Sequence, residues 1–323
     1  MVVRGMGAVG RAILAPMSGV TDVGMREAAY RFGVGLAVSE MVASDHFVAG
    51  DEEARLRAER TSRGRYVVQL AGCQAHWMGE AARLAEAQGA DLVDINMGCP
   101  AKRVTGGWAG SALMRDLDHA TALIRAVVAA TSRPVSVKMR LGWDVGSIVA
   151  PELARRAEAE GAALIVVHGR TRAQFYDGRA DWSAVRAVRQ ATSLPLVVNG
   201  DCAGAGDARA MVEASGADAV MVGRACVGAP WLAGEIDAAL RGAPAPARTP
   251  SDEAEAARGH VLSLVARMGE RRGLRHARKH LAAYSAKSGA PAALREAIVR
   301  EEDATRALAL LDRAFVGVEA AAA

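Results

Sequence analysis

The sequence predicts an α/β fold, a (β/α)8 TIM barrel followed by a small C-terminal helical domain. Eight short apolar runs alternate with Ala-, Arg- and Glu-rich segments that have helical spacing. A weak internal repeat begins at Gly89, Gly161 and Gly216, where each glycine suits the left-handed position that ends a helix before a strand. A doubly wound sheet is the alternative, but it rarely alternates eight strands so strictly.

The eight expected strands are mostly continuous apolar runs, as strands covered on both faces require. In chain order they are AILAP from Ala12, LAVSEM from Leu36, YVVQLAG from Tyr66, LVDINMG from Leu92, PVSVKMR from Pro134, LIVVHGR from Leu164, PLVVNGD from Pro195 and AVMVGRA from Ala219. Helical segments such as WMGEAARLAEAQGA and ELARRAEAEGAA lie between them. The proline-rich stretch RGAPAPARTP then predicts a linker, and SDEAEAA the capped, acidic start of a new helix. We therefore expect a barrel over residues 1–242 and a helical domain over residues 243–323.

Composition narrows the class of protein. Hydrophobic residues make up 51% and charged residues 24%, which is typical of a globular protein with a large core. We expect a cytoplasmic protein, because no window approaches the length of a membrane span. We also expect a monomer. The net charge of +4 lies entirely in the tail, since residues 241–323 carry 14 Lys and Arg against 10 Asp and Glu. No C-x-x-C pair occurs, so neither a disulfide framework nor a metal site is expected, and no role is assigned to Cys73, Cys202 or Cys226.

Polar residues follow almost every expected strand. The active site of a TIM barrel forms at the C-terminal ends of its strands, so these residues are candidates for function. The residues at the strand ends, most of them polar, are Met17, Glu40, Gln69, Asn96, Cys99, Lys138, Arg140, His168, Arg170, Asn199, Asp201, Gly223 and Arg224. The loops after strands seven and eight, NGD and GR, suit the phosphate of a cofactor. Lys138 and Gln69 could bind the polar edge of a flat ring, and His168 is either a ring or substrate contact or a core histidine.

The thiol of Cys99 stands in the stretch DLVDINMGCPAKRVTGG. A lone cysteine is most often a small buried hydrophobe. Here Gly98 permits close approach of a ligand, Pro100 stiffens the turn, and Lys102 with Arg103 makes the surroundings electropositive. Cys99 is therefore a candidate catalytic thiol as well as a candidate core residue.

Taken together, these segments resemble a known family. ILAPMSGVTD, AVSEM, VQLAG, DINMGCPAK, VKMRLGW, VHGRT, VVNGD and VMVGR occur in this order over about residues 12–235. They are similar to the tRNA-dihydrouridine synthases, especially the DusB branch, and the G-C-P element is specific to that family among flavin barrels. ARKHLAAY, residues 277–284, resembles a segment of the DusB helical domain. The resemblance therefore covers nearly the whole chain.

The resemblance implies an FMN enzyme that reduces the C5–C6 double bond of particular uridines in tRNA with NADPH. Hydride would pass from flavin N5 to C6 of uracil, and Cys99 would give the proton to C5. The residues implied to hold FMN are Pro16, Met17, Ser18, Gln69, Lys138, His168, Asn199, Gly200, Asp201, Gly223 and Arg224. Asn96, Lys102, Arg140 and Arg170 are expected to contact the substrate.

A basic stretch in the tail fits a tRNA partner, although most charge runs are only solvated helix faces. It contains a single acidic residue, Glu270, against Arg267, Arg271, Arg272, Arg275, Arg278 and Lys279, with His276 and His280. A small-molecule flavin oxidoreductase of the dihydroorotate or dihydropyrimidine dehydrogenase type is the main alternative, but it would not need this stretch. The second alternative is a non-enzymatic protein, RNA-binding or regulatory, on a barrel that has lost its activity.

Overall fold

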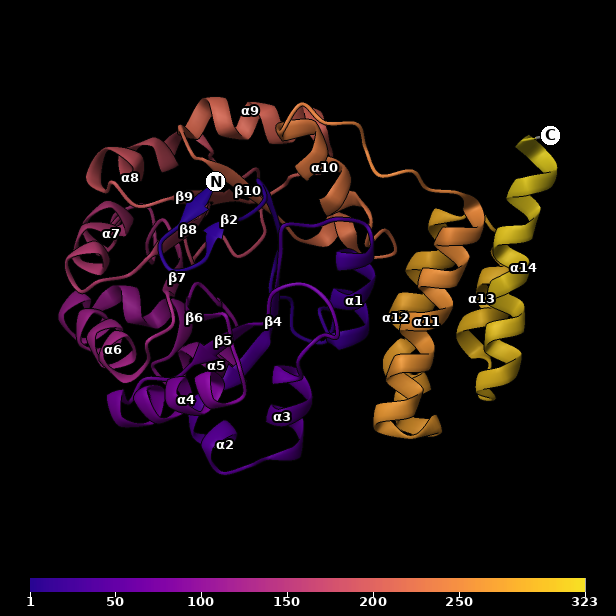
Figure 1. The fold of residues 1–323 in the computed structure, drawn as a ribbon, viewed down its shortest axis with the longest axis horizontal. Helices are drawn as coiled ribbons and strands as arrows, with labels where there is room; N and C mark the ends of the chain where they lie inside the picture. Colours follow the sequence, from indigo (N-terminus) through magenta and orange to yellow (C-terminus); the bar gives the residue numbers. More distant parts are fainter. Residues whose placement is uncertain (323) are drawn as a thin grey trace.

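A closed barrel of eight parallel strands forms the body of the protein, as predicted (Figure 1). The computed structural model describes the backbone of residues 1–322 and the side chains of residues 1–315. The barrel strands are β3 (Ala12–Leu14), β4 (Leu36–Ala43), β5 (Val67–Ala71), β6 (Leu92–Met97), β7 (Val135–Arg140), β8 (Leu164–His168), β9 (Leu196–Asn199) and β10 (Ala219–Val222). Each pairs with the next in chain order, and β10 closes the barrel against β3.

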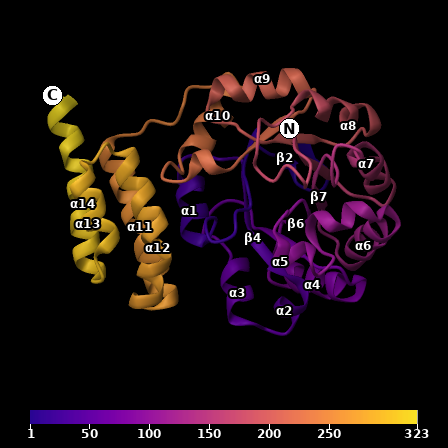
Figure 2. The ribbon, with the colours of Figure 1, turned by 180° about the vertical axis from the view of Figure 1, so that it is seen from behind.

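Helices connect the strands and surround the barrel (Figures 1 and 2). They are α1 (Val23–Arg31), α2 (Ser44–Val48), α3 (Glu52–Ala58), α4 (Ala75–Ala87), α5 (Lys102–Thr105), α6 (Leu117–Ala130), α7 (Ala150–Ala159), α8 (Arg186–Ala191), α9 (Ala205–Ser215) and α10 (Leu232–Leu240). The repeat glycines end their helices as expected, because Gly89, Gly161 and Gly216 have φ angles of 85°, 94° and 70°.

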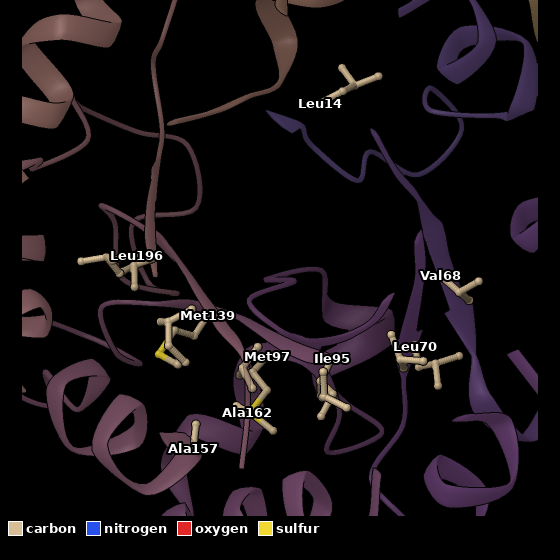
Figure 3. Packing of buried hydrophobic residues seen from close by; sticks show 14 of the residues in the cluster. Leu14, Val68, Leu70, Ile95, Met97, Met139, Ala157, Ala162 and Leu196 are labelled. Atoms are coloured by element: carbon tan, nitrogen blue, oxygen red, sulfur yellow. The ribbon is translucent and has the colours of Figure 1, made fainter. Parts of the chain in front are cut away.

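Successive residues of each barrel strand face opposite sides, and this alternation positions the polar residues. One set, including Val68, Leu70 and Ile95, packs outward against the helices (Figure 3). The other set fills the barrel together with Val3 of an N-terminal hairpin. This hairpin consists of β1 (Val2–Val3) and β2 (Gly7–Ala8), and the sequence did not predict it. Further along this inward set, at the C-terminal ends of the strands, lie Gln69, Asn96, Lys138, His168 and Asn199.

The C-terminal helices lie beside the barrel and have a core of their own (Figures 1 and 2). They are α11 (Pro250–Met268), α12 (Glu270–Lys287), α13 (Ala292–Arg300) and α14 (Ala304–Ala322). A capping box of Thr249 and Asp252 begins α11 at the end of the proline-rich segment. Apolar contacts between Phe32, Trp231 and Ala256 join α11 to the barrel. In the part of the chain that the structure describes, no helix is long and apolar enough to cross a membrane.

Candidate active site

A cavity of about 690 Å³ opens at the C-terminal end of the barrel. Every residue predicted to hold a cofactor lines this cavity, and so do three of the residues predicted to act on a substrate, Asn96, Cys99 and Arg140. The cavity is therefore large enough and polar enough for a bound small molecule.

A chain of hydrogen bonds runs beneath the cavity from β6 to the cysteine loop. The Gln69 side-chain amide donates to the Asp94 carboxylate at 2.6 Å, and Asn96 donates to Gln69 Oε1 at 2.7 Å. Asn96 Oδ1 in turn accepts the backbone N–H of Cys99 at 2.9 Å. Burial raises the pKa of Asp94 to about 6, although the bonds from Gln69 and Ser136 oppose the shift. Sequence reasoning missed Asp94, whose only signal was a carboxylate inside the apolar run LVDINM.

Lys138 presents an ammonium group to the cavity. Burial, with a contribution from Arg140, lowers its pKa to about 8, while Asp94 and Cys99 oppose the shift. Lys138 Nζ forms no hydrogen bond with any residue that the structure describes. Asp94 lies on the neighbouring strand β6, and its negative charge acts to raise the pKa of Lys138. A cation so placed can donate to an electron-rich ring or an anion that enters the cavity.

His168 is buried among cations at the end of β8. Burial lowers the pKa of His168 well below its ordinary value, and Lys138, Arg140 and Arg170 add to the shift. Arg170 Nη1 lies 3.2 Å from His168 Nε2, so this nitrogen accepts and the ring is neutral. His168 is thus a neutral hydrogen-bonding group at the cavity wall.

The loops after β9 and β10 form one side of the cavity. Gly200 has a φ of 122°, and a Cβ there would lie 2.6 Å from Ala180 Cβ, so only glycine fits. The Asp201 carboxylate accepts from the Ala180 N–H at 2.8 Å and from Arg224 at 3.0 Å. The Arg224 side chain stays 63% exposed at the rim. Glycine backbone and an accessible guanidinium in this position fit a phosphate group.

The Cys99 side chain is half-buried, while backbone groups hold its loop. The Cys99 carbonyl accepts from the Ser111 N–H at 3.1 Å and the Ser111 hydroxyl at 2.9 Å. Arg140 donates to the Gly98 carbonyl at 2.9 Å. Because none of these bonds involves the thiol, Sγ is left available at the cavity wall.

The three cations predicted to contact the substrate differ in position. Arg140 lines the cavity but is 1% exposed and donates to the carbonyls of Gly98, Thr171 and Phe175. Arg170 is also 1% exposed and does not line the cavity. It holds Asp201 and His168 from behind, so its position is that of a support rather than a substrate contact. Lys102 is exposed on α5, outside the cavity lining.

Tyr176 is a cavity residue that sequence reasoning missed. Its ring is 51% exposed and lies under two guanidinium groups, 5.5 Å from Arg140 and 5.1 Å from Arg224. The signal available was an aromatic pair in the loop after β8, in RTRAQFYDGR. An exposed aromatic ring at the mouth of a cavity offers a stacking surface for a flat ligand.

The basic residues of α12 lie on two faces. Arg272 and Lys279 turn toward the barrel, where Arg272 pairs with Glu52 at 3.4 Å and Lys279 approaches Gly19. Arg278 is half-buried and lies 3.9 Å from Glu302. The remaining two predicted contacts, Arg271 and Arg275, are exposed and have no recorded ion pair in the described residues. These two offer the most accessible charge for a polyanion.

The chain matches relatives over nearly its full length. A "Probable tRNA-dihydrouridine synthase" of Rhizobium leguminosarum bv. phaseoli is 56% identical over 274 residues, 85% of this chain and 84% of that protein. One of Rhodobacter capsulatus is 49% identical over 312 residues, 96% of each chain. "tRNA-dihydrouridine synthase B" of Xanthomonas campestris pv. campestris is 41% identical over 302 residues, 93% of this chain and 91% of that one.

A solved structure and a family model also match this chain. The histamine dehydrogenase of Rhizobium sp. 4-9 superposes with a TM-score of 0.55 at 12% identity, over 80% of this chain and 50% of that one, which shows a shared fold alone. The model of the family "Dihydrouridine synthase (Dus)" matches residues 13–319. These matches confirm the resemblance found in the sequence. The chain therefore belongs to the dihydrouridine synthase (Dus) family, whose members are flavin-dependent oxidoreductases.

Proposed function

We propose that this protein is a tRNA-dihydrouridine synthase that uses FMN and NADPH to reduce the C5–C6 double bond of specific uridines in tRNA. The observation that carries the proposal is that Cys99 lines the same cavity as the residues proposed to hold the flavin. Family membership and the names of the relatives favour tRNA as the substrate.

The cavity residues fit a flavin phosphate and ring. Gly200, Gly223 and Arg224 would hold the phosphate, because two glycine backbones and a guanidinium line one wall. Lys138 would donate to the polar edge of the ring, and Gln69 lies on a neighbouring part of the wall. The other proposed flavin contacts are Pro16, Met17, Ser18, His168, Asn199 and Asp201. When bound and reduced, FMN would supply the hydride that adds to C6 of uracil.

Cys99 is proposed as the proton donor. Addition of hydride at C6 places negative charge on C5 and the adjoining carbonyl, so C5 must receive a proton. The Cys99 thiol would donate it, and the resulting thiolate would then regain a proton from solvent. Asn96 fixes the Cys99 N–H at 2.9 Å, so it positions the loop that carries the donor.

The helical domain is proposed to bind the tRNA backbone. Arg271 and Arg275 leave two exposed guanidinium groups on α12, and Arg267 has a partner in Glu59 at 2.8 Å. Exposed cations give affinity that falls with salt, since phosphate contacts release counterions. The target uridine must leave its stack to reach a cavity in the barrel.

The test uses the purified full-length protein and tRNA from a strain that lacks dihydrouridine. We expect a yellow protein whose extracted flavin is FMN, and NADPH-dependent formation of dihydrouridine in that tRNA. Turnover of free uracil or dihydroorotate without activity on tRNA would favour the small-molecule oxidoreductase instead. A folded, colourless protein that binds tRNA would favour the RNA-binding alternative.

A variant tests the phosphate site separately. Arg224→Glu reverses the charge at the rim, and we expect it to lose most of its flavin on purification, because the carboxylate repels phosphate. Arg209→Glu is a control on the solvent-exposed side of α9. Full flavin occupancy in a folded Arg224→Glu protein would contradict this assignment.

A further inference from the structure

A second cluster of polar residues, two of them buried and one half-buried, lies where the helical domain meets the barrel. Asp22 comes from the barrel, at the start of α1, while His276 and His280 come from α12. We propose that these three residues bind one divalent transition-metal ion of the zinc type, which joins the helical domain to the barrel. The proposal is independent of the flavin site and of the reaction.

The donor atoms are close enough to share an ion. One ligand atom from each of Asp22, His276 and His280 lies within 4.8 Å of the others. Asp22 Oδ2 and His280 Nε2 are 3.7 Å apart. Tetrahedral zinc with bonds of about 2.0 Å places its ligand atoms roughly 3.3 Å apart. Binding therefore requires contraction by side-chain rotation, without rearrangement of the helices.

His280 gives the independent reason to expect a ligand. Its side chain is 0% exposed, and neither ring nitrogen has a hydrogen-bond partner within the part of the chain whose side chains the structure describes. A neutral imidazole carries one donor and one acceptor, and burying both unpaired is unfavourable. A metal ion would satisfy the acceptor nitrogen, which lies on the side of Asp22.

The aspartate is held in the orientation that a ligand needs. Asp22 Oδ1 accepts the N–H groups of Gly24 at 2.9 Å and Met25 at 3.2 Å at the start of α1. Asp22 Oδ2 lies 3.0 Å from His260 Nε2, and His260 Nδ1 lies 2.9 Å from the Tyr284 hydroxyl. Hydrogen bonds of this kind behind a metal ligand orient it and tune its affinity. His260 is thus a positioning residue for Asp22.

A small cavity lies beside the cluster, and one neighbouring lysine competes with a metal ion for His276. A cavity of about 100 Å³ is lined in part by Asp22, His276 and Glu40, and among the described side chains Glu40 Oε1 is buried without a hydrogen-bond partner. A cavity of this size has room for a water molecule, which would complete the coordination of the proposed ion. Lys279 Nζ lies 3.4 Å from His276 Nε2, so coordination through this nitrogen displaces the lysine, whose side chain is exposed.

Two imidazoles and one carboxylate are typical ligands of zinc and of related first-row ions. The ion would link α1 of the barrel to α12 and stabilise the domain interface. Its role would be structural, because the residues that bind it do not line the proposed flavin cavity.

The experiment measures zinc in the full-length protein with its flavin. The protein is equilibrated with micromolar zinc, desalted and analysed by mass spectrometry for metal content, and cobalt is used in parallel for its visible absorption. We expect about one zinc per chain, a cobalt band typical of tetrahedral coordination, and an unfolding midpoint roughly 5 °C higher with saturating zinc.

Three variants locate the ion. His276→Gln, at a half-buried position that should tolerate the change, and His280→Asn should each lose zinc and the midpoint shift. His119→Asn, an exposed histidine on α6, is the control and should keep both. Far-ultraviolet circular dichroism, which includes the signal of the helical domain, reports whether each variant has folded.

Absence of zinc and cobalt binding by the wild-type protein would overturn the proposal and leave a hydrogen-bonded cluster without an ion. Binding that persists in folded His276→Gln would place the ion elsewhere and would overturn it equally.

Discussion

Replacing Cys99 by alanine tests the proton-donor proposal directly. The change removes Sγ and leaves the hydrogen bonds of the loop intact. These bonds join the backbone of Cys99 to the side chains of Asn96 and Ser111. The side chain is half-buried, so its loss should cost less than about 1 kcal/mol in the free energy of unfolding. FMN content and tRNA binding should therefore remain near those of the wild-type protein.

The expected loss of activity is much larger than the loss of stability. General acids contribute about 10²- to 10⁴-fold to rate, which corresponds to roughly 3 to 5 kcal/mol in the activation free energy. A cysteine that only fills space would change the rate by no more than the fraction of protein unfolded. The size of the effect therefore distinguishes the two roles of Cys99.

Stopped-flow spectroscopy of the flavin separates the two half-reactions. Reduction by NADPH should be unchanged in Cys99→Ala, and reoxidation by tRNA should slow by about 10²- to 10⁴-fold. Cys73→Ala is a matched control, since Cys73 is also half-buried and is not proposed to act. Wild-type rates of reoxidation in Cys99→Ala would refute the proposal.

Three further predictions follow from the geometry. Gly200→Ala should lose flavin, and its free energy of unfolding in urea should fall by about 1 to 3 kcal/mol. The reason is that φ at this position is 122° and the added Cβ would clash with Ala180 Cβ. Gly204→Ala should keep both, because the backbone at Gly204 is extended and no described residue lies within 4 Å of the added Cβ. Equal losses in the two variants would contradict the steric argument. The affinity for FMN, measured by fluorescence quenching, should fall as the pH rises through about 8. The Lys138 ammonium is proposed to donate to the ring, and because its pKa is lowered to about 8 this charge is lost above that pH. Lys138→Met should bind weakly with no change across this range, and a wild-type affinity that rises with pH would be inconsistent with the assignment. Arg271→Glu with Arg275→Glu should reduce the slope of log affinity for tRNA against log salt by about two, and an unchanged slope would exclude these arginines from the interface.

The strands could be predicted well because their signal is local. Each barrel strand begins within one residue of its predicted start, since the apolar runs are continuous and end in polar residues. The N-terminal hairpin was missed because Val2–Val3 and Gly7–Ala8 are too short to show periodicity. Val3, Met6 and Val9 pack with the inward side chains of the barrel, and this tertiary contact gives the hairpin an order that no local pattern predicts.

The residues of the candidate cavity could also be predicted, because parallel strands bring their C-terminal ends together once the barrel closes. The roles of the arginines could not. Arg140 and Arg170 follow strands like the other candidates, but both are buried and donate to backbone carbonyls, which depends on loops that fold over them.

The sequence alone determined the barrel, the helical tail and the set of residues that line the cavity. The strands and the polar residues at their ends can be recognised locally along the chain, and closure of the sheet then brings these ends together. Only the tertiary structure decided which cations are accessible, because exposure depends on packing between segments far apart in the chain. Arg271 and Arg275 remain exposed, while Arg278 of the same basic stretch is partly covered. It also brought Asp22 within 3.0 Å of His260, a contact across the two domains that no spacing in the sequence could indicate.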